Sequence, residues 1–427
     1  MASTSLTRTL TTPTSDKIFT FSAWVKRSAL GSEGYVFTIG SNGGSSPSHW
    51  YSIRYANEKI YVQRSGTGQL ITNAVYRDVS AWYHIVLTND TTQSTDSNRI
   101  KLYVNGEQPS LGTATYPSQN ATLDGINGAR CALGLTYSGT GNYFDGSMAH
   151  INFIDGTAYD ADTFGETDSL TGIWKPITSP SVTYGTNGFF LKFASSGSMG
   201  TDSSGNSNNF TVNGTLTQTQ DTPSNVFATY NPLGNFFPAD TFSNGNTTQT
   251  TNAGNYTYNI STLGASNGKY YCEIKNSTNN NNSIGIADRP SISTTNGLTG
   301  TTYGWAYVMS GQVYNNGSIV ATYNTVTTND IVGIALDLDN NKVYFSKNGT
   351  WQGSSDPSAG TGGISITAPA SNRTGFYFFG SGDEATNSAV HNANFGNGYF
   401  GTTAVASAGT NASGIGIFEY DVPTGYT

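Results

Sequence analysis

Two carboxylates separated by one residue, Asp337 and Asp339, are the best sequence candidates for acid–base chemistry. Cleavage of a glycosidic bond uses two carboxyl groups, and a Glu-x-Asp-x-x-Glu strand places them on one sheet face because residues two apart point the same way. Here the third carboxylate is missing, and Asn340 and Asn341 follow at once. We therefore expect the pair to belong to a turn. A carboxylate pair drawn from separate loops stays open.

Histidine offers no clearer route to catalysis. His84 lies beside Trp82, but no Gly-x-Ser-x-Gly turn supplies the nucleophile that a catalytic histidine would activate. His49, His150 and His391 show no spacing typical of metal ligands. The sequence thus predicts a protein that is not an enzyme.

Aromatic rings at turns are the remaining candidates for a binding site. Trp50 follows Ser48 and His49 in an expected loop, and Trp351 comes directly after the turn Asn348-Gly349. Such rings stack on sugar faces or anchor protein partners, although both tryptophans could instead cap the ends of a core. The candidate ligand-binding residues are Trp50, His49, Trp351 and Tyr307.

A strand–turn–strand unit at residues 331–349 organises the rest of the chain. Val332, Ile334 and Leu336 alternate with smaller residues, which is the period of a half-buried strand. Asn340-Asn341 and Asn348-Gly349 have the chemistry of tight turns. About 240 residues earlier, residues 84–106 repeat this pattern, which predicts two β-domains built on one plan.

Composition supports an all-β chain of more than one domain. Its 427 residues exceed the roughly 250–300 that a single core organises. Charged residues make up 11%, whereas the chain has 51 Gly, 26 Tyr and 21 Phe, which fits short strands joined by many turns. No stretch of about a dozen residues has helical periodicity.

Charge and hydropathy exclude several kinds of partner. The net charge is −8 without any run of Lys or Arg, so we expect no nucleic-acid partner. The sequence contains no run of about 20 apolar residues, so we expect no membrane insertion. The N-terminus lacks the apolar core of a signal peptide, so we expect synthesis in the cytoplasm. Cys131 and Cys272 lie in apolar stretches and are expected to be buried thiols.

Composition shifts also mark the expected boundaries. A stretch rich in Gly, Ser and Asn separates the two domains and reads as a connector, which Phe210, Val212 and Leu216 could pin to the first domain. The apolar end of the chain is expected to dock on a domain. The expected segments are a first domain at 1–195, a connector at 196–238, a second domain at 239–400 and a tail at 401–427.

Several motifs recur in order through the first domain. They are Phe19-Thr-Phe-Ser-Ala-Trp24, Trp82-Tyr-His-Ile-Val-Leu87, Ile100-Lys-Leu-Tyr-Val-Asn-Gly106, Phe144-Asp-Gly-Ser-Met-Ala149, Ile151-Asn-Phe-Ile-Asp-Gly156 and Phe164-Gly-Glu-Thr-Asp168. This order resembles the laminin-G/concanavalin A-like jelly rolls. The longer pattern is similar to structural proteins of tailed bacteriophages, especially marine ones.

A second set of motifs fills residues 240–400. It comprises Gly268-Lys-Tyr-Tyr-Cys-Glu-Ile274, Ser283-Ile-Gly-Ile-Ala287, Tyr303-Gly-Trp-Ala-Tyr-Val308, Val313-Tyr-Asn-Asn-Gly317, the 331–349 hairpin and Ala393-Asn-Phe-Gly396. This order resembles the SPRY (B30.2-like) domain, another jelly roll and largely a binding fold. The two resemblances together imply tandem jelly-roll β-sandwiches joined by the Gly/Ser/Asn-rich connector.

The first resemblance also leaves calcium open as a cofactor, because laminin-G-like domains sometimes bind it through loop carboxylates and carbonyls. Calcium takes about six to eight oxygen ligands. The candidate ligands are Asp145, Asp155, Asp160 and Asp162. No other cofactor is expected.

The resemblances imply a non-enzymatic protein of the bacteriophage virion. We expect a tail or receptor-binding fibre component that recognises host surface glycan or protein, located on the particle in many copies or as a homo-oligomer beside other virion proteins. The alternatives are a capsid (head) fibre or decoration protein, a structural adaptor that binds no glycan, and a tail-associated polysaccharide hydrolase.

Overall fold

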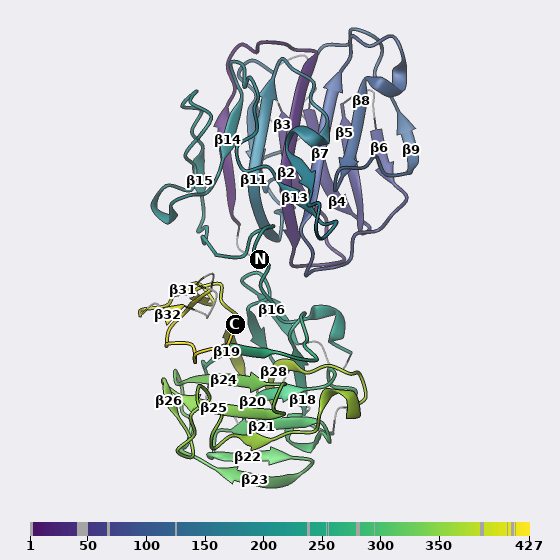
Figure 1. The fold of residues 1–427 in the computed structure, drawn as a ribbon. Coiled ribbons are helices and arrows are strands. Elements are labelled where there is room, and N and C mark those ends of the chain that lie inside the picture. Colours follow the sequence, from purple (N-terminus) through teal and green to yellow (C-terminus); the bar gives the residue numbers. More distant parts are fainter. Residues whose placement is uncertain are drawn as a thin grey trace. The chain divides into compact units, whose positions relative to one another are not determined.

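The structure is a computed structural model of the 427-residue chain. It describes the whole chain except residues 1–2, 41–49, 66–68, 124–125, 237–239, 253, 255, 279–281, 294, 385–387, 408, 411–413 and 415. The chain divides into two compact units, Met1–Gln218 and Thr219–Thr427 (Figure 1). Each unit is built from antiparallel strand pairs, so the predicted all-β class of two tandem sandwiches is confirmed.

The first unit consists of two facing sheets. The eight-stranded sheet has the order β15 (Thr211–Asn213), β1 (Ser5–Thr9), β10 (Arg130–Leu133), β3 (Gly34–Gly40), β4 (Trp50–Ala56), β5 (Lys59–Arg64), β6 (Gln69–Thr72) and β9 (Leu111–Thr115). The five-stranded sheet has the order β14 (Phe189–Leu191), β11 (Gly146–Asp155), β2 (Ile18–Arg27), β7 (Tyr83–Asp90) and β8 (Ile100–Val104). A separate hairpin pairs β12 (Gly165–Thr167) with β13 (Trp174–Pro176).

The core of the first unit lies between these sheets, as the alternation of β2 requires. Phe19, Phe21, Ala23 and Val25 face inward, and Trp24 faces the other way. The Phe21 ring stacks on Phe37 of β3 at a centroid distance of 4.2 Å, which joins the two sheets. Aromatic pairs of this kind add about 0.5–1.5 kcal/mol beyond the apolar area they bury.

The second unit repeats the two-sheet plan. One sheet has the order β16 (Thr241–Ser243), β17 (Thr248–Thr250), β29 (Val390–Asn394), β19 (Lys269–Asn276), β24 (Ile331–Asp337), β25 (Lys342–Lys347) and β26 (Thr350–Trp351), with β27 (Ile364–Ser365) also paired to β25. The other has the order β18 (Thr257–Ile260), β28 (Phe378–Asp383), β20 (Asn282–Ala287), β21 (Gly304–Val308), β22 (Gln312–Asn315) and β23 (Ser318–Thr322).

The hairpin predicted at 331–349 is confirmed as β24 and β25. Its inward residues Val332, Ile334 and Leu336 belong to the core of the second unit. Asn341 has φ 54° and Asn348 has φ 47°, so both turns use the left-handed backbone that Asn tolerates. The two cysteines are free and buried, as expected.

Short elements complete the described part of the chain. The last residues form the pairs β30 (Tyr399–Phe400) with β31 (Thr403–Ala404) and β32 (Gly409–Thr410) with β33 (Ile417–Phe418). The described helices are 3-10 turns, namely η1 (Asp96–Asn98), η2 (Ala161–Thr163), η3 (Ser196–Ser198), η4 (Pro232–Gly234), η5 (Leu298–Gly300) and η6 (Pro369–Ser371). None of these is long enough to cross a membrane.

Residues 196–238, expected as a connector, contribute to both units. Strand β15 pairs with β1, and Phe210 is buried in the first core with Leu216 packed against it. Val212 is 39% exposed. Tyr230 is fully buried in the second core, where its hydroxyl lies 2.6 Å from Ser381 Oγ.

Candidate functional site

The outer face of the eight-stranded sheet carries Trp50. Strand β4 alternates, so Tyr51 and Ile53 enter the core while Trp50 and Arg54 point to the other side. Trp50 is the first residue of β4, so the predicted loop position was wrong. Its backbone exchanges two hydrogen bonds with Ser65, from Trp50 N to Ser65 Oγ at 3.1 Å and from Ser65 N to Trp50 O at 2.9 Å.

Five side chains touch in sequence across this face, and we call them the aromatic ladder: Trp50, Tyr137, Tyr35, Arg54 and Tyr61. The Trp50 and Tyr137 rings stack at 4.4 Å with an interplanar angle of 9°, and Tyr137 meets Tyr35 edge-on at 6.1 Å. The Arg54 guanidinium lies 5.4 Å from the Tyr35 ring centroid and 5.2 Å from that of Tyr61. Trp50, Tyr137 and Tyr61 remain half-buried, so their rings keep surface for a ligand.

The ladder is fixed electrostatically at Arg54. Its Nε lies 2.6 Å from Glu33 Oε1, and its Nη1 donates to Tyr35 Oη at 3.1 Å. Burial raises the pKa of Tyr35, and the adjacent guanidinium only partly opposes this, so the phenol stays protonated. A planar guanidinium between two rings and a carboxylate has little freedom left. The ladder is therefore a rigid surface.

The chain segment that supplies Tyr137 crosses the same face. Gly134 N donates to Val36 O at 3.2 Å, and Tyr35 N donates to Asn142 O at 3.2 Å. The Asn142 amide also donates to Glu33 Oε2 at 2.8 Å. Tyr137 was not among the residues singled out from the sequence, because its pairing with Trp50 depends on this long-range crossing.

The other predicted ligand-binding residues have different positions. His49 lies outside the described residues. Tyr307 has no exposed surface, and its hydroxyl donates to the Asn324 carbonyl within the second core. The structure therefore contradicts direct ligand contact by Tyr307. Trp351 lies on β26, half-buried, with its ring 6.3 Å from that of Tyr271.

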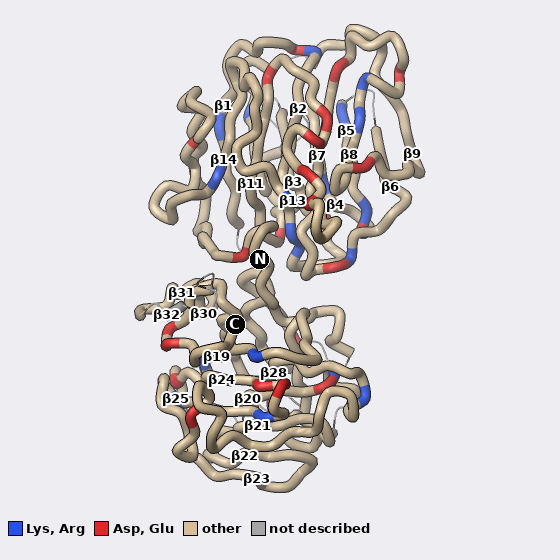
Figure 2. The backbone as a smooth tube through the Cα atoms, viewed as in Figure 1, with Lys and Arg blue, Asp and Glu red and all other residues tan. Residues whose placement is uncertain are grey.

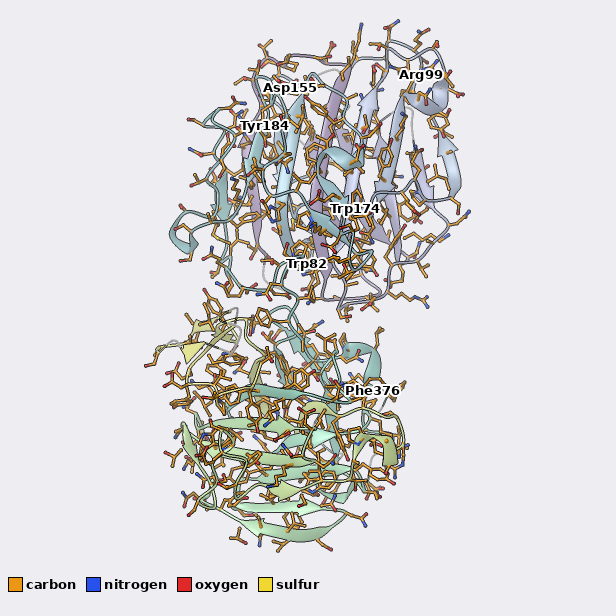
Figure 3. All side chains as sticks on the ribbon, viewed as in Figure 1. Trp82, Arg99, Asp155, Trp174, Tyr184 and Phe376 are labelled. Carbon is orange, nitrogen blue, oxygen red and sulfur yellow. The ribbon has the colours of Figure 1, made fainter. Side chains whose placement is uncertain are left out.

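The predicted calcium ligands do not gather. Asp155 accepts hydrogen bonds from three backbone N–H groups at 2.9–3.2 Å, and it also donates its own N–H to Tyr184 O, at the end of the unit where Figure 3 labels both residues. Asp160 accepts from Tyr103 Oη at 2.6 Å. Within the described part of the chain, no group of three or more His, Cys, Asp or Glu side chains could hold a metal ion. Asp145, Asp155, Asp160 and Asp162 thus form no such group, and calcium binding through them stays a prediction.

A serine–histidine contact does occur, but inside the protein. His84 Nε2 lies 2.9 Å from Ser22 Oγ, and both residues have no exposed surface. Burial lowers the pKa of His84 to about 3, so the ring is neutral. Trp174 of the β12–β13 hairpin, labelled in Figure 3, places its ring 6.0 Å from that of His84 and covers it. A substrate could not reach this pair without displacing the hairpin.

The Asp337 and Asp339 pair also serves structure. Asp337 is fully buried and accepts from the Lys269 ammonium at 3.1 Å, while Asp339 Oδ1 accepts from Gly268 N at 2.8 Å. Burial alone would raise the pKa of Asp337, but hydrogen bonds from Asn340 and Lys269 lower it below its usual range. A general acid needs the opposite shift. Asp337 is therefore not suited to act as the general acid of a glycoside cleavage.

Comparison with known families matches both units. Residues 3–162 match the sequence model of the concanavalin A-like lectin/glucanases superfamily, and residues 269–356 match that of the SPRY domain. The chain carries a concanavalin A-like domain followed by a SPRY domain. The aromatic ladder thus belongs to the concanavalin A-like domain, and Trp351 to the SPRY domain.

Solved structures resemble part of the chain. The SPRY domain of human HERC1 is 18% identical over 38% of this chain and 96% of that one, with a TM-score of 0.32. The PSpry domain of TRIM65 is 12% identical over 39% and 91%, with a TM-score of 0.29. Stonustoxin is 14% identical over 39% and 27%, also with a TM-score of 0.29. No curated protein matches this chain.

Charge in the described part of the chain does not point to another site. Lys and Arg are interspersed with Asp and Glu over both domains, as Figure 2 shows. A rigid aromatic surface bordered by one ion pair is suited to stacking and hydrogen bonding. The ladder is therefore the candidate binding surface.

Proposed function

We propose that this chain is a recognition protein that binds its ligand through the aromatic ladder of the concanavalin A-like domain and catalyses no reaction. The observation that carries the proposal is the stacked Trp50–Tyr137 pair, which is half-exposed, joins a residue of β4 to one of a turn, and is continuous with Arg54. Fixed rings lose little conformational freedom when a ligand binds, which favours affinity. Binding of a ligand to the ladder requires no chemical reaction.

The chemistry of the ladder favours a glycan. The apolar face of a sugar ring stacks on tryptophan and tyrosine, and Arg54 with Glu33 offers a donor and an acceptor for hydroxyl groups. One such site gives weak binding. Many copies on one particle would raise the avidity by about 10²–10⁴-fold.

The resemblance to tailed-bacteriophage structural proteins supports a place on the virion. A tail or receptor-binding fibre that touches host surface glycan suits a weak multivalent site. A capsid fibre or decoration protein would have nearly the same surface. Immunogold electron microscopy of purified particles separates these positions, since label at the tail tip supports the fibre and label over the head supports decoration. Particles without label would refute the virion assignment.

The binding proposal is tested on a glycan array with the full chain. We expect wild-type protein to select a small set of glycans, and Trp50→Ala to lose them while Gln63→Ala on the neighbouring strand β5 keeps them. An array without any signal, combined with tight binding to another virion protein, would support the structural adaptor instead.

A polysaccharide hydrolase is the competing function, because the matched superfamily includes glucanases. Incubation of the chain with host capsule or lipopolysaccharide, followed by an assay for new reducing ends, distinguishes the two. We expect no release of sugar. If the Asp337→Asn variant still releases sugar, the catalytic carboxylates lie outside the Asp337 and Asp339 pair.

A further inference from the structure

The chain's last residues lie on the outer face of the SPRY sheet. We define the C-terminal strap as Ile417–Thr427 and the groove as the surface that it covers. Phe418 and Tyr426 of the strap are 1% and 0% exposed, and they pack against the strand residues Tyr271 and Tyr344 with Trp351 at the edge. The Phe418 ring meets Tyr271 at 5.1 Å. The expected docking of the tail is confirmed.

Glu273 in the groove binds the backbone of the strap. This glutamate lies on β19 and has no exposed surface. Its carboxylate accepts from the backbone N–H groups of Glu419 and Tyr420, each at 2.8 Å. Tyr271 Oη and Asn394 Nδ2 complete its hydrogen bonds at 3.1 and 3.2 Å. A buried carboxylate aimed at two consecutive N–H groups is a docking contact for a peptide main chain.

The end of the strap is held as an added strand would be. Thr427 N donates to Lys269 O at 3.0 Å, and Tyr271 N donates to Thr427 O at 2.9 Å. Thr424 N also donates to Ser358 Oγ at 3.0 Å. Main-chain bonds with aromatic slots on either side are the usual basis of peptide recognition at a sheet.

We propose that this groove is a peptide-docking site that also takes the C-terminal strap of a second copy of the chain. The contacts of a strap are the same whether it comes from its own chain or from a neighbour, which makes exchange of such a segment a low-cost route to assembly. Residues 401–416 join the strap to β30 and have a contour length of at most ~55 Å. They would reach an adjacent copy only after the β30–β31 and β32–β33 pairings open.

Concentration decides which strap occupies the groove. A tethered segment competes with an effective concentration of about the millimolar range. Exchange between copies is therefore rare in dilute solution and becomes substantial when copies are crowded together. The inference rests on the groove alone and does not depend on a ligand at the aromatic ladder.

Paired cysteine substitutions in the full chain test the proposal. Ser358→Cys and Thr424→Cys are both at exposed positions joined by the hydrogen bond described above. The doubly substituted chain should form an intramolecular disulfide, which verifies the geometry. If it does not, the strap is not seated as the proposal requires.

The decisive sample mixes two singly substituted chains, one with Ser358→Cys and one with Thr424→Cys. We expect a disulfide-linked heterodimer whose yield rises with protein concentration and falls when a synthetic peptide of residues 416–427 is added. The control pairs Thr424→Cys with Ser318→Cys, an exposed residue of β23. Heterodimer no more abundant than in this control would overturn the proposal, whatever the glycan array shows.

Discussion

The indole Nε1 of Trp174 donates a hydrogen bond of 3.0 Å to Nδ1 of His84. This bond leaves the proton on Nε2, which is placed to donate to Ser22 Oγ. Trp24 stacks on the same imidazole at 4.7 Å. A histidine held between two indoles, in one tautomer and without solvent, anchors the β12–β13 hairpin to the sheet and cannot act as a base for an external substrate.

Replacing Trp174 by Phe should destabilise the concanavalin A-like domain. A smaller aromatic ring is kept, but a buried imidazole nitrogen loses its donor, at a cost of about 1–3 kcal/mol in the free energy of unfolding. Urea unfolding monitored by fluorescence measures this. Ile173→Ser is the matched control, since Ile173 is 63% exposed on the same hairpin. Equal stability of the two variants would show that the hydrogen bond contributes nothing.

Because of His391, we expect the free energy of unfolding to depend on pH in the acid range. Burial lowers its pKa to about 3, and neither ring nitrogen has a hydrogen-bond partner among the described residues. The unfolded chain binds a proton near pH 6.5, so this stability is fully present above pH 6.5 and is lost as the pH falls towards 3, by about 1.4 kcal/mol per unit.

His391→Leu therefore has an effect that changes with pH. Near pH 7.5 we expect less than about 1 kcal/mol of change, because an apolar group replaces an unpaired polar one. At pH 5 the variant should be more stable than the wild type. Unfolding midpoints in urea at both pH values check this. A constant difference between the two proteins would rule out the neutral buried imidazole.

Glu273 gives the opposite dependence. Burial raises its pKa to about 7, more than its four hydrogen bonds lower it, and the titratable groups around it are Tyr271, Cys272, Glu419 and Tyr420. A carboxyl whose folded pKa is raised stabilises fully below its ordinary value near 4.5 and loses that contribution as the pH rises through 7. Docking of the strap should weaken over this range.

Amide hydrogen exchange of residues 417–427, corrected for intrinsic rates, measures this weakening between pH 5.5 and 8.5. We expect protection in the wild type to fall with rising pH, by at most about tenfold per unit. Glu273→Gln removes the titrating group, so its protection should be independent of pH. A wild-type profile that is equally flat would refute the role of Glu273.

The strands and turns were predictable because their signals are local. Alternation in Phe19–Val25 fixes which residues face the core, and Asn348-Gly349 marks a turn without reference to the rest of the chain. The positions of Tyr137 and Glu273 depend on distant segments. On β19, alternation alone makes Glu273 a solvent-facing residue, and only the strap changes that. The prediction that Tyr307 contacts a ligand was wrong for a related reason. A tyrosine can lie at a surface or in a core, and the sequence does not show the buried partner of its hydroxyl.

The aromatic ladder predicts graded losses of glycan affinity. Removing one anchoring aromatic ring by Trp50→Ala or Tyr137→Ala should weaken binding by about 10- to 100-fold. Arg54→Lys keeps the charge but loses the planar contact with two rings, so we expect an intermediate loss. Isothermal titration with the best glycan from the array measures these changes, and Gln63→Ala is the control. Affinity unchanged in all three ladder variants would exclude this surface.

Gly349 tests the link between the hairpin turn and the strap. It has φ +78°, and a Cβ there would lie 2.6 Å from the Tyr420 ring. Gly317 has φ +77° and also follows an asparagine, but nothing lies within 4 Å of its Cβ position. Alanine at either site should cost about 1–2 kcal/mol through the left-handed backbone. Only Gly349→Ala should also displace Tyr420 and raise amide exchange in the strap. If Gly317→Ala raises that exchange equally, general destabilisation explains the effect and the groove does not depend on the turn.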